Sequence, residues 1–183
     1  MKTVRLPRSF TVTASGTVGE VSRVDETFIE NTKKIILAAA HIESQLERII
    51  MRFLFPQANE QQSLFEAAIL TAEFFTMSAK RRVFLAILAN FDAISGAERS
   101  EIDRLLARVI RYRNAFTHGR VSYGKAYEAT LSYFEGAPRT AVITDDYLTT
   151  LETDILSCFT VIDELAVKAG LYPAPKTMTM PSA

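Results

Sequence analysis

The sequence contains few residues that bind metals or form disulfides. Cys158 is the one cysteine, and His41 and His118 are the two histidines, among 183 residues. A single cysteine excludes an intramolecular disulfide, and three soft ligands spaced this widely exclude a zinc finger or zinc ribbon. We therefore expect no metal site and no bound cofactor.

The sequence also lacks an excess of charge of either sign and a long apolar run. Its 21 basic and 21 acidic residues cancel, so any attraction to RNA has to come from a local patch. No run reaches the roughly 18 apolar residues of a membrane span, and residues 9–19 lack the apolar core of a signal peptide. We expect a cytoplasmic protein that makes no membrane contact.

Hydrophobic residues make up 48% of the chain, which at this length is enough for one domain with a core. We expect residues 1–24 to form an extended N-terminal arm and residues 25–170 to form a helical domain. Residues 171–183 contain three prolines and are expected to form a flexible tail.

Hydrophobic periodicity indicates a mostly helical fold. Asp25 can cap a long helix that ends at Phe55, before Pro56, because apolar residues recur there every seven positions from Phe28 to Ile49. Further helices are expected over residues 60–72, 79–91, 97–117 and 144–169, with a β-hairpin over 127–134 and 139–143. The predicted class is an all-α, up-and-down bundle of four to five helices, with a small β-hairpin before the last helix.

Arg113 falls within the apolar stripe of the helix over 97–117. On a helical wheel Leu106 and Val109 lie within about 40° of it. Arginine is rarely buried without a partner, so we expect a carboxylate, backbone carbonyls, a second subunit or a ligand phosphate beside it. Glu43 is one candidate carboxylate. Asn114 and His118 lie on the same side of the last turn and a half.

Each of these residues also has an ordinary structural interpretation. His118 could be a cation that complements the dipole at the end of a helix. Arg104, Arg108 and Arg111 could line a phosphate track or form a solvated helix face. Lys80 and Arg81 stand at the start of a helix, where cations are unfavourable, and this favours a functional or intersubunit role.

Residues 113–118, with the sequence RNAFTH, resemble the Arg-polar-x-x-x-His signature that closes a bundle helix in the HEPN superfamily. The resemblance extends over about residues 25–170. Its further elements are Ile42-Glu43 within the long first helix, the entry to the third helix at Ser78–Arg81, and the whole segment Arg111–Gly119.

The resemblance implies metal-independent cleavage of RNA at the interface of a homodimer. Arg113, Asn114 and His118 are then the catalytic residues, and the candidate RNA-binding residues are Lys80, Arg81, Arg111 and Arg120. Cleavage through the RNA 2′-hydroxyl needs a base, an acid and positive charge on the phosphate. One chain has one histidine on this helix, whereas two chains across a twofold axis supply two.

Three functions are compatible with these observations. The first is a HEPN endoribonuclease of stress response, toxin or phage defence type, whose partners would include an antitoxin or regulatory protein. The second is a HEPN-like module that binds RNA, a nucleotide or a protein without cleavage. The third is a helical interaction module in which Arg113 only joins helices.

Overall fold

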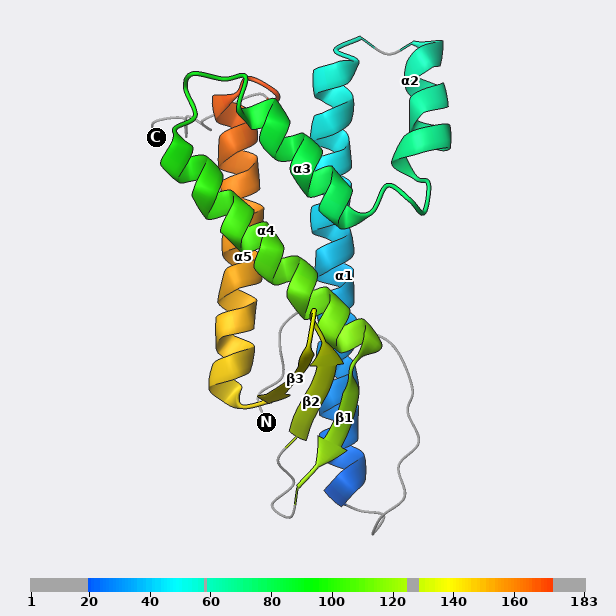
Figure 1. Cartoon of the computed structure of the whole chain (residues 1–183), viewed down its shortest axis with the longest axis vertical. Coiled ribbons are helices and arrows are strands. Elements are labelled where there is room, and N and C mark those ends of the chain that lie inside the picture. The colour runs from blue at the N-terminus through cyan, green and yellow to red at the C-terminus, as the bar shows by residue number, and fades with distance from the viewer. Residues whose placement is uncertain (1–19, 58, 125–128, 173–183) are drawn as a thin grey trace, which may run out of the picture.

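The structure is a computed structural model of the chain, and it describes residues 20–57, 59–124 and 129–172, with the backbone alone for 20–25. Within these ranges lie five α-helices and one antiparallel sheet (Figure 1). The helices are α1 (Glu20–Leu54), α2 (Glu60–Phe65), α3 (Met77–Leu88), α4 (Gly96–His118) and α5 (Asp145–Lys168). The strands are β1 (Arg120–Tyr123), β2 (Ala129–Phe134) and β3 (Pro138–Val142). The expected class, mostly helical with a small sheet before the last helix, is confirmed.

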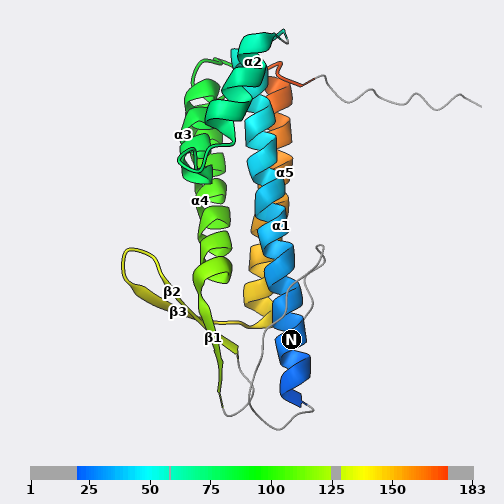
Figure 2. The same ribbon diagram turned by 90° about the vertical axis from the view of Figure 1, so that its right-hand side faces the viewer.

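The long helices form two layers, α1 with α5 and α3 with α4 (Figure 2). A hydrogen bond of 3.0 Å from Gln45 to Asp163 joins α1 to α5. The stacked rings of Phe28 and Phe116, 5.6 Å apart, join α1 to α4. The seven-residue row of α1 is buried as expected, and its members are Phe28, Ile35, Ile42 and Ile49.

The long first helix begins earlier than the sequence predicts. It starts at Glu20, so residues 20–24 are helical rather than part of an extended arm, and Asp25 is not its cap. Val21 and Val24 precede Phe28 at helical spacing, and no proline or glycine follows Gly19 before Asp25, so nothing stops the helix there. The rest of the expected arm, residues 1–19, lies outside the described residues.

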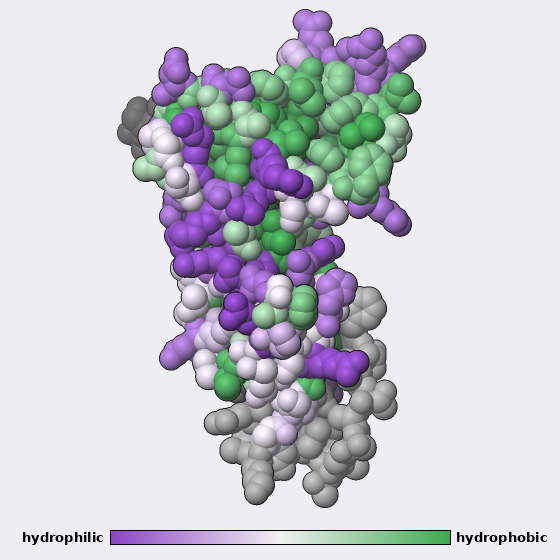
Figure 3. Space-filling model, viewed as in Figure 1, coloured by the Kyte–Doolittle hydropathy of each residue, from purple (hydrophilic) through white to green (hydrophobic). Residues whose placement is uncertain are grey.

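The second expected helix consists of two kinds of turn. At the start of α2 the Asn59 side chain accepts a hydrogen bond from the Gln62 N–H, and η1 (Glu66–Leu70) then continues the segment as a π-helix. This segment covers a second, smaller core around Ile50, Leu70 and Ile87. Hydrophobic side chains gather on the surface over α2 and η1, whereas hydrophilic ones dominate over the middle of α4 (Figure 3).

The expected hairpin is part of a three-stranded sheet of order β1-β2-β3. Strand β1 was not expected from the sequence, because this strand has only four residues and follows α4 after a single glycine. Arg120 of β1 pairs with Ser132 of β2, and Gly136 (φ 67°) forms the tip between β2 and β3. This hairpin projects away from the helical layers (Figure 2). Residues 127 and 128, expected in the hairpin, lie outside the described residues.

The first two residues of the expected tail pack onto the fold. The backbone N–H groups of Leu171 and Tyr172 both donate to the Ala166 carbonyl, at 2.8 and 3.2 Å. Both side chains are half-buried against the core. The ordered domain therefore extends at least to Tyr172, and residues 173–183 lie outside the described part.

Candidate functional site

The C-terminal end of α4 is fixed by a glycine that has no room for a side chain. The Gly119 N–H donates to the Ala115 carbonyl at 2.8 Å, and β1 begins at the next residue. A Cβ on Gly119 would clash with the Ala115 carbonyl oxygen and would lie 2.7 Å from Leu131 Cδ1 on β2. The end of α4 and the close packing of β2 therefore both require glycine after His118.

Arg113 lies at the edge of the buried face of α4 and not within it. Leu106, Val109 and Phe116 are buried, but Arg113 is half-exposed. Its Nη1 donates to Asn114 Oδ1 at 3.1 Å, which is the one acceptor found for it among the described residues. Because a guanidinium has five N–H donors, most of its hydrogen-bonding capacity is left for solvent or a ligand.

The carboxylate that we considered as a partner of Arg113 is occupied elsewhere. Glu43 accepts a hydrogen bond from Lys80 Nζ at 2.7 Å, and Glu47 accepts another at 2.6 Å. Arg113 is therefore not tied to α1 through Glu43, and of the partners considered for Arg113 this carboxylate is excluded.

Asn114 and His118 are exposed and stand one helical turn apart. Since α4 remains helical through His118, both side chains lie on one face, and Arg111 lies on that face too. Arg113 lies about 140° from His118 around the helix axis. One chain thus presents Asn114 and His118 on one face of α4. Arg113 is linked to this face by its hydrogen bond to Asn114.

Lys80, which was expected among the RNA-binding residues, is buried and engaged with carboxylates. Its side chain is buried between two carboxylates of α1, 6% exposed. Burial lowers the pKa of Lys80, but the hydrogen bonds and charges of Glu43 and Glu47 outweigh it, so the pKa is raised above the ordinary lysine value. The unfavourable position at a helix start, which favoured a functional or intersubunit role, is explained by this contact between α1 and α3.

Arg81 and Arg111 are also engaged with carboxylates. Arg81 Nε donates to Asp103 Oδ1 at 2.8 Å and links α3 to α4. Arg111 Nε donates to Glu135 Oε1 at 2.7 Å and tethers the hairpin tip to α4. Arg120 differs, because it is exposed on β1 and no carboxylate in the described residues pairs with it. Of the four expected RNA-binding cations, Arg120 alone is both exposed and unpaired in this part of the chain.

A polar cluster that was not expected from the sequence joins α4 to α5. The buried Asp154 carboxylate accepts hydrogen bonds from Arg108 Nη1 at 2.7 Å and from Tyr112 Oη at 2.7 Å. Burial, and then Asp154, raise the pKa of Tyr112, and the same two causes raise the pKa of the Cys158 thiol to about 12. The sequence contains an indication of this cluster, because the charged Asp154 interrupts the apolar row of Leu151 and Cys158. Arg108 is thus a packing residue and not part of a phosphate track.

The described residues include no group of three or more histidine, cysteine or acidic side chains that could hold a metal ion. Nor is any helix in that part of the chain long and apolar enough to cross a membrane. Comparisons with protein-family models, with curated proteins and with solved structures found no match to this chain. The functional interpretation of this chain therefore rests on the geometry at the end of α4.

Proposed function

We propose that the chain is a metal-independent endoribonuclease of the HEPN type that acts in the cytoplasm in stress response, toxin activity or phage defence. The observation that carries the proposal is the group Arg113, Asn114 and His118 at the surface end of α4. These side chains are accessible, and they lie outside the ion pairs that engage Lys80, Arg81 and Arg111. An up-and-down bundle with a hairpin before its last helix is the fold that the HEPN resemblance implies.

The proposed active site is composite, at the interface of a homodimer. Cleavage needs both a base and an acid, and α4 carries one histidine, His118, so a second copy is needed to supply the other. Two copies related by a twofold axis supply two arginines and two histidines on one surface. An antitoxin or regulatory protein is a further proposed partner, which would act by covering this surface.

The reaction would proceed by attack of the RNA 2′-oxygen on the adjacent phosphorus. One His118 takes the 2′-hydroxyl proton, and the other donates a proton to the leaving 5′-oxygen. The planar Arg113 guanidinium binds the negative charge that develops on the phosphorane. Asn114 orients that guanidinium. The products would be a 2′,3′-cyclic phosphate and a 5′-hydroxyl.

A second function, binding without cleavage, is favoured by a different observation. Three of the four expected RNA-binding cations are paired with acids, and the chain has no net charge. These three cations therefore do not form a track of free charges for RNA. This arrangement fits a module that holds a short RNA, a nucleotide or a protein at the Arg113 and Arg120 end.

The two functions differ in one assay. The purified chain is incubated with single-stranded and structured RNA in EDTA, beside a His118→Ala variant, and the product ends are identified. We expect cleavage that persists in EDTA, is lost in the variant, and leaves cyclic phosphate ends. Binding without cleavage would support the second function, and cleavage that leaves 5′-phosphate ends would contradict the proposed chemistry.

A further inference from the structure

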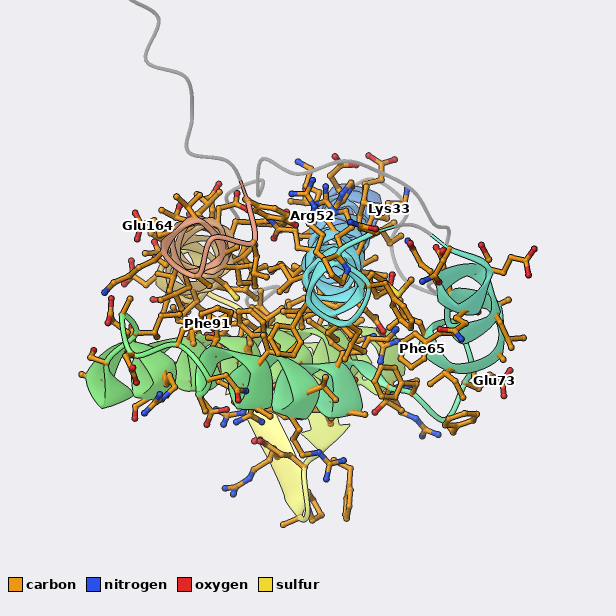
Figure 4. The ribbon with its side chains drawn as sticks, turned by 90° about the horizontal axis from the view of Figure 1, so that it is seen from above. Lys33, Arg52, Phe65, Glu73, Phe91 and Glu164 are labelled. Carbon is orange, nitrogen blue, oxygen red and sulfur yellow. The ribbon has the colours of Figure 1, made fainter. Side chains whose placement is uncertain are left out.

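A cavity of about 510 Å³ lies at the other end of the molecule from the sheet, between the last turns of α1, the α2–η1 segment and Tyr172. Figure 4 looks down on this end and shows Arg52 on α1 with the α2–η1 segment beside it. The volume is within the range of about 300–1,000 Å³ typical of small-molecule sites. One wall is apolar and consists of Met51, Phe55 and Leu70.

Two arginines from one face of α1 line this cavity. Arg48 and Arg52 stand one helical turn apart, so their like charges repel. Arg52 is held in place, because its Nη1 donates to the Leu171 carbonyl at 2.9 Å and its guanidinium lies 5.4 Å from the centre of the Tyr172 ring. Arg48 is exposed and has no carboxylate partner in the described residues. An anion between them would relieve the repulsion.

Two acids also line the cavity, but they differ in availability. Glu47 is engaged by Lys80 Nζ at 2.6 Å. Glu66, at the start of the π-helical η1, is exposed and has no cation partner among the described residues. The cavity therefore has a cationic wall on α1 and a free carboxylate on η1.

The Tyr172 hydroxyl is buried without a hydrogen-bond partner. A buried polar group in this state bears its full desolvation penalty, so a movement of the hydroxyl toward a ligand in the cavity would gain an interaction that the protein alone does not make. The nearby Arg48 and Arg52 lower the pKa of Tyr172, but burial outweighs them and raises it. The hydroxyl therefore stays protonated at neutral pH and can donate to an anion.

We propose that this cavity binds a small molecule that has an anionic group at one end, an N–H donor at the other and an apolar or aromatic body between them. The anion is held by Arg48, Arg52 and the Tyr172 hydroxyl, and the donor by Glu66. Both an aminopurine nucleotide and a para-amino aromatic carboxylate have this chemistry, with a phosphate or a carboxylate as the anion. The site is independent of the proposed ribonuclease function, because it shares no residue with the end of α4.

The test is calorimetric titration of the full chain with adenosine 5′-monophosphate and, separately, with 4-aminobenzoate. We expect saturable binding of one probe with a Kd of about 1 mM or tighter; which probe binds identifies the anion. Arg48→Ala should weaken that binding by about tenfold or more. Tyr172→Phe should weaken it severalfold without lowering the melting temperature, because the hydroxyl makes no bond in the free protein.

Two control variants locate the binding. Arg82→Ala removes an exposed arginine of α3 and should leave the affinity unchanged, whereas Arg113→Ala tests whether the nucleotide binds at the end of α4 instead. The proposal is overturned if neither probe binds at about 10 mM, or if Arg48→Ala and Tyr172→Phe bind as tightly as the wild type. It is equally overturned if the affinity falls in Arg82→Ala or Arg113→Ala as much as in Arg48→Ala.

Discussion

The partners of individual cations separate the candidate site from the rest of the surface. Lys80 and Arg81 face carboxylates that lie 22 to 37 residues away in the chain, whereas Arg113 bonds only to its neighbour Asn114 among the described residues. Helical spacing predicted that Asn114 and His118 share a face, but it placed Arg113 within the apolar stripe, whereas Arg113 lies at the edge of the buried face. The sequence did not predict the partners of Lys80 and Arg81, because those depend on how the helices pack.

Lys80 should matter for stability and not for RNA. Lys80→Met keeps an apolar stem but leaves Glu43 and Glu47 facing each other, half-buried and one helical turn apart. We expect a loss of about 2–3 kcal/mol in the free energy of unfolding, measured by urea denaturation. Replacing both glutamates by glutamine in the same chain should recover most of that loss.

The matched control for Lys80 is Arg82→Met, which removes an exposed cation two residues away. It should change the free energy of unfolding by less than about 0.5 kcal/mol. Equal losses in the two variants would show that the Lys80 carboxylate contacts do not stabilise the fold.

Gly119 should tolerate no side chain. Gly119→Ala places a Cβ against the Ala115 carbonyl and Leu131, at distances that only a shift of β2 or the helix end can relieve. We expect a loss of about 2–3 kcal/mol in the free energy of unfolding. Gly96→Ala is the control, because the atom nearest to its Cβ would be Arg99 Nη2 at 3.9 Å. A Gly119→Ala protein as stable as Gly96→Ala would contradict the close packing of β2 on the end of α4.

At the scale of elements, the position of α4 is set by its two ends. Ser95 and Glu98 form a capping box at the first turn, and Glu98 also accepts a hydrogen bond from Lys168 Nζ at 2.7 Å, which ties the start of α4 to the end of α5. Gly119 stops the helix at the other end. These two contacts determine where the residues of the candidate site are presented.

The Glu98 contacts make part of the stability depend on pH. The hydrogen bonds from Lys168, and then from Ser95, lower the pKa of Glu98 from 4.5 to about 2. Because the pKa of Glu98 is lower in the folded state than in the unfolded state, ionised Glu98 stabilises the fold, and it does so fully above the ordinary glutamate pKa. This contribution is lost as the pH falls from about 4.5 towards about 2. The melting temperature of wild type should therefore fall more steeply over that range than that of Glu98→Gln.

Glu101→Gln provides the control for this pH dependence. Glu101 pairs with Arg104 on the same helix, and both side chains are nearly half exposed, so the pair contributes little. Its melting temperature should follow the wild-type slope. Parallel slopes for wild type and Glu98→Gln would show that the capping box does not hold a charged Glu98 in the fold.

Strong hydrophobic periodicity made the long helices predictable. Where that periodicity is absent, as in η1 and β1, the sequence did not predict the type of element. The row from Phe28 to Ile49 identified α1, and the expected start of the last helix at residue 144 agrees with the Thr144 cap, which accepts from the Tyr147 N–H. The π-helical turn of η1 has no sequence signature that separates it from an α-helix. The four residues of β1 are too few for alternation to be distinguished from a loop, and they form a strand because β2 pairs with them.

At the scale of the whole molecule, the end of α4 lies beside the sheet, and the α2–η1 segment lies at the opposite end (Figure 1). The second core and the cavity belong to that opposite end. The two proposed sites are therefore separated along the long axis. The proposed catalytic site depends on a second copy of the chain, and the proposed small-molecule cavity lies within one chain.

The composite ribonuclease site is tested most directly by mixing subunits. Wild type and His118→Ala are combined at constant total concentration, allowed to exchange subunits, and assayed for RNA cleavage in EDTA. If each site needs both histidines, only dimers with two wild-type chains are active, so an equal mixture should retain about a quarter of the wild-type activity. An equal mixture that retains about half of it would mean that each chain acts alone, and would contradict the proposed composite site.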